Sequence, residues 1–219
     1  MTLDITVRGS AEQRHRAERA IVALVLAIEG PDKQQVFTDA VEVQEPLIVH
    51  LKELVEAHAV STWSSDQVRV FSHRPWSGDG ASGATVHVAK VHVRAEFSDF
   101  ERLSGFLDRW SAVEGVEIDD ISWDISAENR RLREAEVRKS AVDDAVAKAQ
   151  GYADAVRRGK VVAVHIADRG MLTDSGEGPP PPLYAAAKLG RHDPSVAGLD
   201  LTPQQIVIQI EVDARFHAS

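Results

Sequence analysis

A single stretch, residues 126–168, constrains the fold of this chain more than any other. Residues 129–158 contain no proline and one glycine, Gly151, which favours one long helix. Residues 160–166 (KVVAVHI) come directly afterwards and are nearly all apolar, as is typical of a short buried strand. The sequence therefore predicts a long helix that leads into a strand and packs on its sheet.

Apolar residues recur in this helix at steps of three and four, which places them in one stripe. Most are alanine or valine, so the stripe predicts a close approach to a sheet. Ser126 is suited to the N-cap position, because its hydroxyl can accept a hydrogen bond from a first-turn N–H. The predicted stripe consists of Leu132, Ala135, Val142, Val146, Ala149, Ala153 and Val156.

The start of the helix is rich in arginine, at Arg130, Arg131 and Arg133. One interpretation is a patch that binds anions or nucleic acid. Glu134 and Glu136 are interleaved with the arginines, however, which favours an ordinary solvated helix face.

Composition excludes several classes of function. The chain has 219 residues, a net charge of −9 and no cysteine. An acidic protein repels polyanions, so we expect no nucleic-acid partner. The lack of cysteine excludes disulfides, thiolate zinc sites and cysteine nucleophiles. No apolar run approaches the ~20 residues that span a bilayer, so we expect no membrane insertion.

The first residues have no apolar signal core and already alternate like a strand over residues 3–7. We therefore expect a cytoplasmic protein as the chain stands. A periplasmic or secreted protein from which a signal peptide has been removed would look the same. Gly9 and Ser10 then predict a turn or a bulge.

Residues 20–28 are nearly all apolar, which predicts a central strand covered on both faces. Residues 32–58 show helical spacing, and Pro46 predicts a kink or a break within that helix. Residues 68–72 and 85–97 read as the strands of a hairpin. The apolar phase of the second strand changes, which predicts a bulge near Ala89.

Ser98 and Glu101 form a capping box, with Ser98 as the predicted N-cap of the next helix. Residues 116–125 then read as a strand with a phase shift near Asp119 and Asp120. Residues 169–203 are rich in glycine and proline, a long connection that is uncommon in a compact domain. Residues 206–216 alternate cleanly and predict the last strand.

His87 and His92, with His73 across the hairpin, are the candidate metal ligands, because imidazole suits zinc, copper or nickel. The site requires the bulge near Ala89, since simple alternation puts His87 and His92 on opposite faces. The alternative is that these are ordinary surface or half-buried histidines that bind no metal. Trp76, in the hairpin loop, could add a ligand or protein contact.

No constellation of catalytic residues is visible. The G-x-S-x-G pentapeptide of serine hydrolases is absent, and Ser82 lies in a hairpin loop with no base or acid placed beside it. Gly78, Gly80 and Gly83 match G-x-G-x-x-G, but a strand follows instead of a helix. We therefore expect a protein that is not an enzyme and has no cofactor.

The order of these segments resembles the SIMPL domain family, a domain of unknown function found in bacterial periplasmic, oligomeric, immunogen-like proteins. Residues 5–9 (ITVRG) look like the opening strand of that family, and 20–29 like its second strand. Residues 116–152 are similar to its strand and Arg-led, Ala-rich helix, and the segments 160–166 and 205–216 to its last two strands.

The resemblance implies an α+β fold of two mixed or antiparallel sheets, each backed by helices, with one long Ala-rich helix. We expect one SIMPL-like domain or two intertwined subdomains, residues 1–30 with 127–219 and residues 31–126. The resemblance also implies a homo-oligomer, and it brings no catalytic residues. The leading functional expectation is an assembly or stress-related scaffold with a protein partner. The alternative is a stress protein that binds a small ligand or metal.

Overall fold

The computed structural model describes residues 2–75, 83–172 and 201–219. These residues divide into two compact units. The first contains residues up to 16, from 125 to 172 and from 205 onward; the second contains residues 17–124 and the segment that ends at 204. The expected subdomains placed residues 17–30 in the other group. The observed grouping differs because the strand in this segment hydrogen-bonds within the sheet of the second unit.

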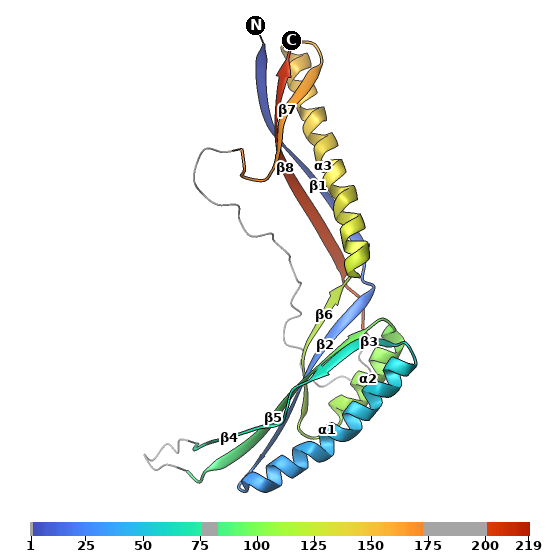
Figure 1. Cartoon of the computed structure of the whole chain (residues 1–219), viewed down its shortest axis with the longest axis vertical. Coiled ribbons are helices and arrows are strands. Elements are labelled where there is room, and N and C mark those ends of the chain that lie inside the picture. Colours follow the sequence, from blue (N-terminus) through green and yellow to red (C-terminus); the bar gives the residue numbers. More distant parts are fainter. Residues whose placement is uncertain (1, 76–82, 173–200) are drawn as a thin grey trace. The chain divides into compact units, whose positions relative to one another are not determined.

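The sheet of the first unit is antiparallel and has the strand order β1-β8-β7. Its strands are β1 (Leu3–Arg16), β7 (Val161–Asp168) and β8 (Gln205–Ala218). β1 pairs with β8 along its whole length, from Leu3 opposite Ala218 to Arg16 opposite Gln205. The long helix α3 (Ala127–Ala155) runs along this sheet (Figure 1). Ser126 is its N-cap, as predicted, and accepts the Asn129 N–H.

Helix α3 lies very close to β1. A Cβ atom placed on Gly9 would come within 2.0 Å of the Ala141 carbonyl oxygen and 2.7 Å of the Ala145 Cβ. β1 continues through Gly9 and Ser10 in regular pairing with β8, so the predicted turn or bulge is wrong. Gly9 serves packing here, because a larger residue would push the helix away from the strand.

The buried stripe of α3 differs from the predicted one. Ala149 and Ala153 are buried as predicted, but Leu132, Val146 and Val156 are exposed. The helix presents its smallest side chains because only these allow the observed distance from the sheet. The buried residues of α3 are Val137, Ala141, Ala145, Ala149 and Ala153.

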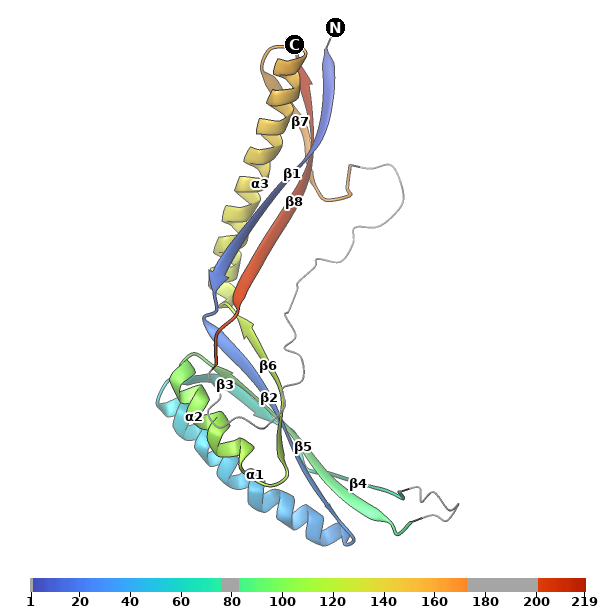
Figure 2. The same cartoon turned by 180° about the vertical axis from the view of Figure 1, so that it is seen from behind.

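The second unit combines a five-stranded antiparallel sheet with two helices. The strands follow the order β3-β5-β2-β6, and β4 also pairs with β5. Both helices pack on one face of the sheet, side by side (Figure 2). The elements are β2 (Arg19–Gly30), α1 (Lys33–Glu56), β3 (Val60–Ser65), β4 (Arg69–His73), β5 (Val86–Phe97), α2 (Phe100–Ser111) and β6 (Val116–Asp124).

Two local predictions about the helices of this unit are tested by the structure. α1 continues through Pro46 as one helix, so it is not split. Asp99 is the N-cap of α2 and accepts the Glu101 and Arg102 N–H groups, so the prediction of Ser98 as N-cap is wrong. The Ser98 hydroxyl instead donates to the His58 carbonyl.

The phase shift predicted in β6 is confirmed. Ala23 pairs with Asp120, whereas Leu24 pairs with Ile118, so one residue is extra on β6. The predicted α+β class, with helices backing two antiparallel sheets, is also confirmed. None of the helices in the described ranges is long and apolar enough to cross a bilayer.

Candidate interaction sites

The three histidines predicted to bind metal lie on β4 and β5. Strand β5 pairs with β2 and with β4 in a continuous register through Ala89, so the predicted bulge is wrong. Regular alternation therefore places His87 and His92 on opposite faces of the sheet. His73 lies opposite Val86 and shares its face, which is not the face of His87. The structure does not bring these three imidazoles together.

Nowhere in residues 2–75, 83–172 and 201–219 do three His, Asp or Glu side chains gather in a way that could hold a metal ion. Trp76, which we predicted as a contact residue, lies outside the described residues.

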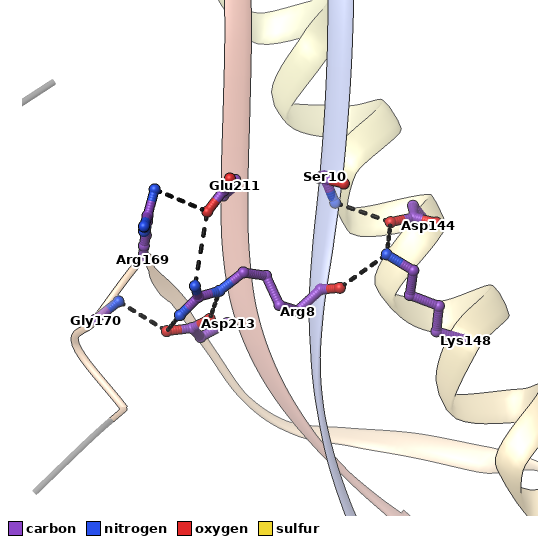
Figure 3. A network of polar contacts seen from close by, with 8 residues as sticks. All are labelled: Arg8, Ser10, Asp144, Lys148, Arg169, Gly170, Glu211 and Asp213. Carbon is purple, nitrogen blue, oxygen red and sulfur yellow. Dashed lines mark hydrogen bonds and ion pairs between the residues drawn. The ribbon is translucent and has the colours of Figure 1, made fainter. Parts of the chain in front are cut away.

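Among the residues that the structure describes, Asp213 has the most buried charged side chain and is 6% exposed. Asp213 accepts from the Arg8 Nε at 2.7 Å and Nη2 at 3.3 Å, and from the Gly170 N–H at 2.7 Å (Figure 3). Glu211 pairs with Arg169 at 3.2 Å and faces Arg8 at 3.7 Å. The network joins β1, β8 and the turn that follows β7.

The charges and hydrogen bonds of this network suit a structural role, in which it holds β1, β8 and the turn after β7 together. The hydrogen bond from Arg8 holds the pKa of Asp213 below its usual range, against the opposing effect of burial. Both carboxylate oxygens of Asp213 are engaged, so it is a poor general base. We therefore interpret the hydrogen bonds of Asp213 as stabilising the fold of the first unit.

A second polar contact ties β1 to α3. Asp144 accepts the Ser10 N–H at 2.8 Å and pairs with Lys148 at 2.6 Å (Figure 3). Lys148 also donates to the Arg8 carbonyl at 3.0 Å. The hydrogen bond from Lys148, followed by that from Ser10, lowers the pKa of Asp144. These bonds fix the register of helix against strand.

The sequence did not indicate a part-buried polar pair in the second unit, between α1 and α2. The Trp110 Nε1–H donates to the His50 Nδ1 at 3.0 Å. Burial, with help from the positive charge of Arg109, lowers the pKa of His50, so its neutral form is favoured. Nothing in the sequence marks His50, because its partner is 60 residues away.

On β6, the acidic residue Asp124 is held by an arginine of the neighbouring strand. Arg19 on β2 reaches Asp124 at 2.7 Å on one side and Glu96 on β5 at 3.1 Å on the other. This side chain therefore links three neighbouring strands of the sheet.

Strand β7 is an exposed apolar edge. It was predicted to be buried, but Val162 is 66%, Val164 41% and Ile166 52% exposed. Among the described residues β7 pairs only with β8, so the N–H and C=O groups of its outer edge lack a strand partner. The sequence could not show this, because a short apolar run does not reveal by itself whether its strand is central or at an edge.

A groove of about 750 Å³ lies beside β7, between α3 and the start of the strand. Val146 is exposed on the flank of α3 that borders this groove. The lining is mixed, with apolar and charged side chains: Asp143, Val146, Ala147, Gln150, Asp154, Arg158, Gly159, Lys160 and Val161.

These features describe an α+β protein of helix-backed antiparallel sheets with an exposed strand edge. The sequence model of one family, SIMPL, described as "Protein of unknown function (DUF541)", matches residues 5–216. The chain therefore belongs to the SIMPL family, as its segment order predicted. No curated protein matches the sequence.

Proposed function

We propose that this protein is a non-enzymatic assembly protein that forms homo-oligomers through β7. The observation that carries the proposal is the exposed apolar edge of this strand. An exposed apolar edge is a template for pairing with another strand, and monomeric proteins usually protect such edges with charges, proline or bulges. β7 has one register shift against β8, between Ala163 and His165, but it contains neither proline nor glycine, and its charged residues stand only at its borders.

The charges at those borders favour a second copy of β7 as the partner. Lys160 precedes the strand and Asp168 ends it, and both are exposed. In an antiparallel pair of two β7 strands, the lysine of each copy lies near the aspartate of the other. A parallel pair would instead bring like charges together, which is destabilising.

The groove beside β7 supports the same proposal. Strand addition gives affinity through main-chain hydrogen bonds, and side chains of the added strand need a surface to pack on. The flank of α3 supplies that surface with Val146 and Ala147.

The test is the mass of the protein in solution, measured by size-exclusion chromatography with light scattering. We expect a species larger than the 23.9 kDa chain. Val162→Lys and Ile166→Lys place charge on the edge and should shift the mass toward one chain. Tyr152→Lys is the matched control, because Tyr152 is 61% exposed on α3 but does not line the groove.

A wild-type protein that is a clean monomer at high concentration contradicts the proposal. An oligomer that resists both β7 substitutions would also contradict the role of this edge.

A further inference from the structure

Helices α1 and α2 cover one face of strand β2, and no described helix covers its other face. Ala20, Val22, Leu24 and Leu26 face α1 and α2 and are buried with them in one core. Residues 20–28 were predicted to be covered on both sides, and β2 is indeed central, between β5 and β6. Within the described part of this unit, however, both helices pack on the same face. The other face presents Ile21, Ala23 and Ala27, which are half-buried, and Val25, which is 8% exposed.

Charged residues border this apolar strip on both sides, with opposite signs. Residues directly opposite in an antiparallel ladder share a face. Ala23 lies between Arg94 on β5 and Asp120 on β6. Val25 likewise lies between His92 and Glu117.

The basic side continues onto the next strand. Lys90 on β5 pairs with Ala27 on one side and with Arg69 of β4 on the other. Over the rows of Ala23 to Ala27 the face therefore carries a basic stripe on β5 and β4, an apolar strip on β2 and an acidic stripe on β6. Glu96, opposite Ile21 on the same face of β5, is acidic, but its charge is paired with Arg19.

These charges have no ion-pair partner in the described part of the chain. Arg94 and Asp120 are two strands apart, about 10 Å, which is too far for an ion pair. Arg19 provides the contrast on the same face, because from β2 it reaches a carboxylate on each neighbouring strand. The residues without a partner are Arg69, Lys90, Arg94, Glu117 and Asp120.

We propose that this face binds the same face of a second copy of the chain, related by a two-fold axis that runs along β2. That rotation superposes each β2 residue on the same residue of the partner subunit. It also places the β5 residue beside it over the β6 residue of the other copy. Arg94 then faces the partner subunit's Asp120, and the apolar strips meet on the axis. Two sheets packed face to face lie about 10 Å apart, and small residues such as Ala23 and Ala27 suit such an approach.

The charge pattern selects this arrangement and this occupant. A two-fold axis in the sheet plane but across the strands would place acid over acid and base over base. The isologous contact is complementary only with the axis along β2. This inference rests on the proposed homo-oligomer and adds a second contact surface, in the unit that does not contain β7.

Charge reversal tests the inference. Arg94→Glu or Asp120→Arg alone should place like charges in contact and lower the mass of the oligomer in light scattering by at least twofold. The double variant Arg94→Glu, Asp120→Arg restores opposite charges and should recover the wild-type mass. Lys52→Glu is the control, because it reverses an exposed charge on α1. Circular dichroism of each single variant checks that it is folded.

A cross-link gives an independent measurement. The chain has no cysteine, so Ala23→Cys introduces a single thiol. This thiol should lie close to its own copy across the axis, and a short bismaleimide should yield a covalent dimer. Lys52→Cys should yield none.

The two proposals fail in different ways. A monomeric wild type overturns the proposed function and this contact together. An oligomer whose mass is unchanged by Arg94→Glu, or not recovered by the double variant, overturns only the contact on β2. An oligomer that is not cross-linked at position 23 also overturns it.

Discussion

Replacing Gly9 with alanine tests whether the close approach of β1 and α3 holds the first unit together. Gly9 has no positive φ angle, so its backbone conformation suits any residue. On backbone grounds alone, Gly9→Ala should stabilise the protein by about 0.4–1 kcal/mol, because alanine restricts the unfolded chain. The packing of α3 predicts the opposite sign.

The magnitude follows from the distances. The new Cβ would lie 2.0 Å from the Ala141 carbonyl oxygen. Strand and helix would have to separate by about 1.5 Å to restore an ordinary contact of about 3.5 Å. The obstacle is backbone, so no side chain can rotate away. Overpacking typically costs 1–3 kcal/mol, and we expect the upper end. After the backbone gain is subtracted, the net loss should be about 2 kcal/mol.

The assay is urea unfolding followed by far-ultraviolet circular dichroism. Gly9→Ala should lower the free energy of unfolding by about 2 kcal/mol. Gly151→Ala is the matched control, because Gly151 lies in α3 with no atom near a new Cβ. That substitution should stabilise the protein by about 0.5–1 kcal/mol through helix propensity. A Gly9→Ala protein as stable as the wild type would refute the argument that packing requires glycine at this position.

Further substitutions test other features by the same assay. His50 has a lowered pKa in the folded state, so its contribution to stability is complete above about pH 6.5 and declines as the pH falls through the folded value. His50→Asn keeps an acceptor but cannot titrate, so the urea midpoint should lose this pH dependence. Arg157 follows α3 with φ 58°, so Arg157→Gly should stabilise by about 1 kcal/mol, and Arg158→Gly, which has no positive φ, should not. Asp213→Asn should destabilise by about 2 kcal/mol at pH 7, while Glu136→Gln, in an exposed ion pair, should change stability by less than about 0.5 kcal/mol. Because the pKa of Asp213 is lowered by folding, its contribution is present above about pH 4 and is lost as the pH falls through the folded value.

Periodicity predicted those elements whose apolar residues are large. α2 buries Leu103, Phe106, Leu107 and Trp110, as its spacing indicated. The alternation of residues 206–216 likewise matches β8. In both elements large side chains carry the burial, so the hydrophobic pattern and the packed face coincide.

The same reasoning fails where packing selects small residues. Alanine carries a weak hydrophobic signal, so Leu132 and Val156 dominated the predicted face of α3 although both are exposed. Gly9 was predicted to form a turn or a bulge, because its packing partner Ala141 is more than 130 residues further along the chain. β3 (Val60–Ser65) was missed altogether, because its side chains are mostly polar and it lies at the edge of a sheet.

The candidate surfaces depend on strand order and register, which a single sequence does not determine. The apolar character of β7 was visible, but its position at an edge was not. Similarly, Arg94 and Asp120 became neighbours of Ala23 only through the pairing of β5, β2 and β6.

The pairing of β1 with β8 has a consequence for the order in which the chain folds. β1 and β8 are the first and last strands in the sequence shown, and they lie side by side (Figure 1). Leu3 can therefore pair with Ala218 only after Ala218 has been synthesised. Residues 17–124, by contrast, are continuous and form most of the second unit. During synthesis the second unit can fold early, whereas β1 must wait, unpaired, for nearly the whole chain. We therefore expect the first unit to be the slow step of folding and the segment most in need of chaperones.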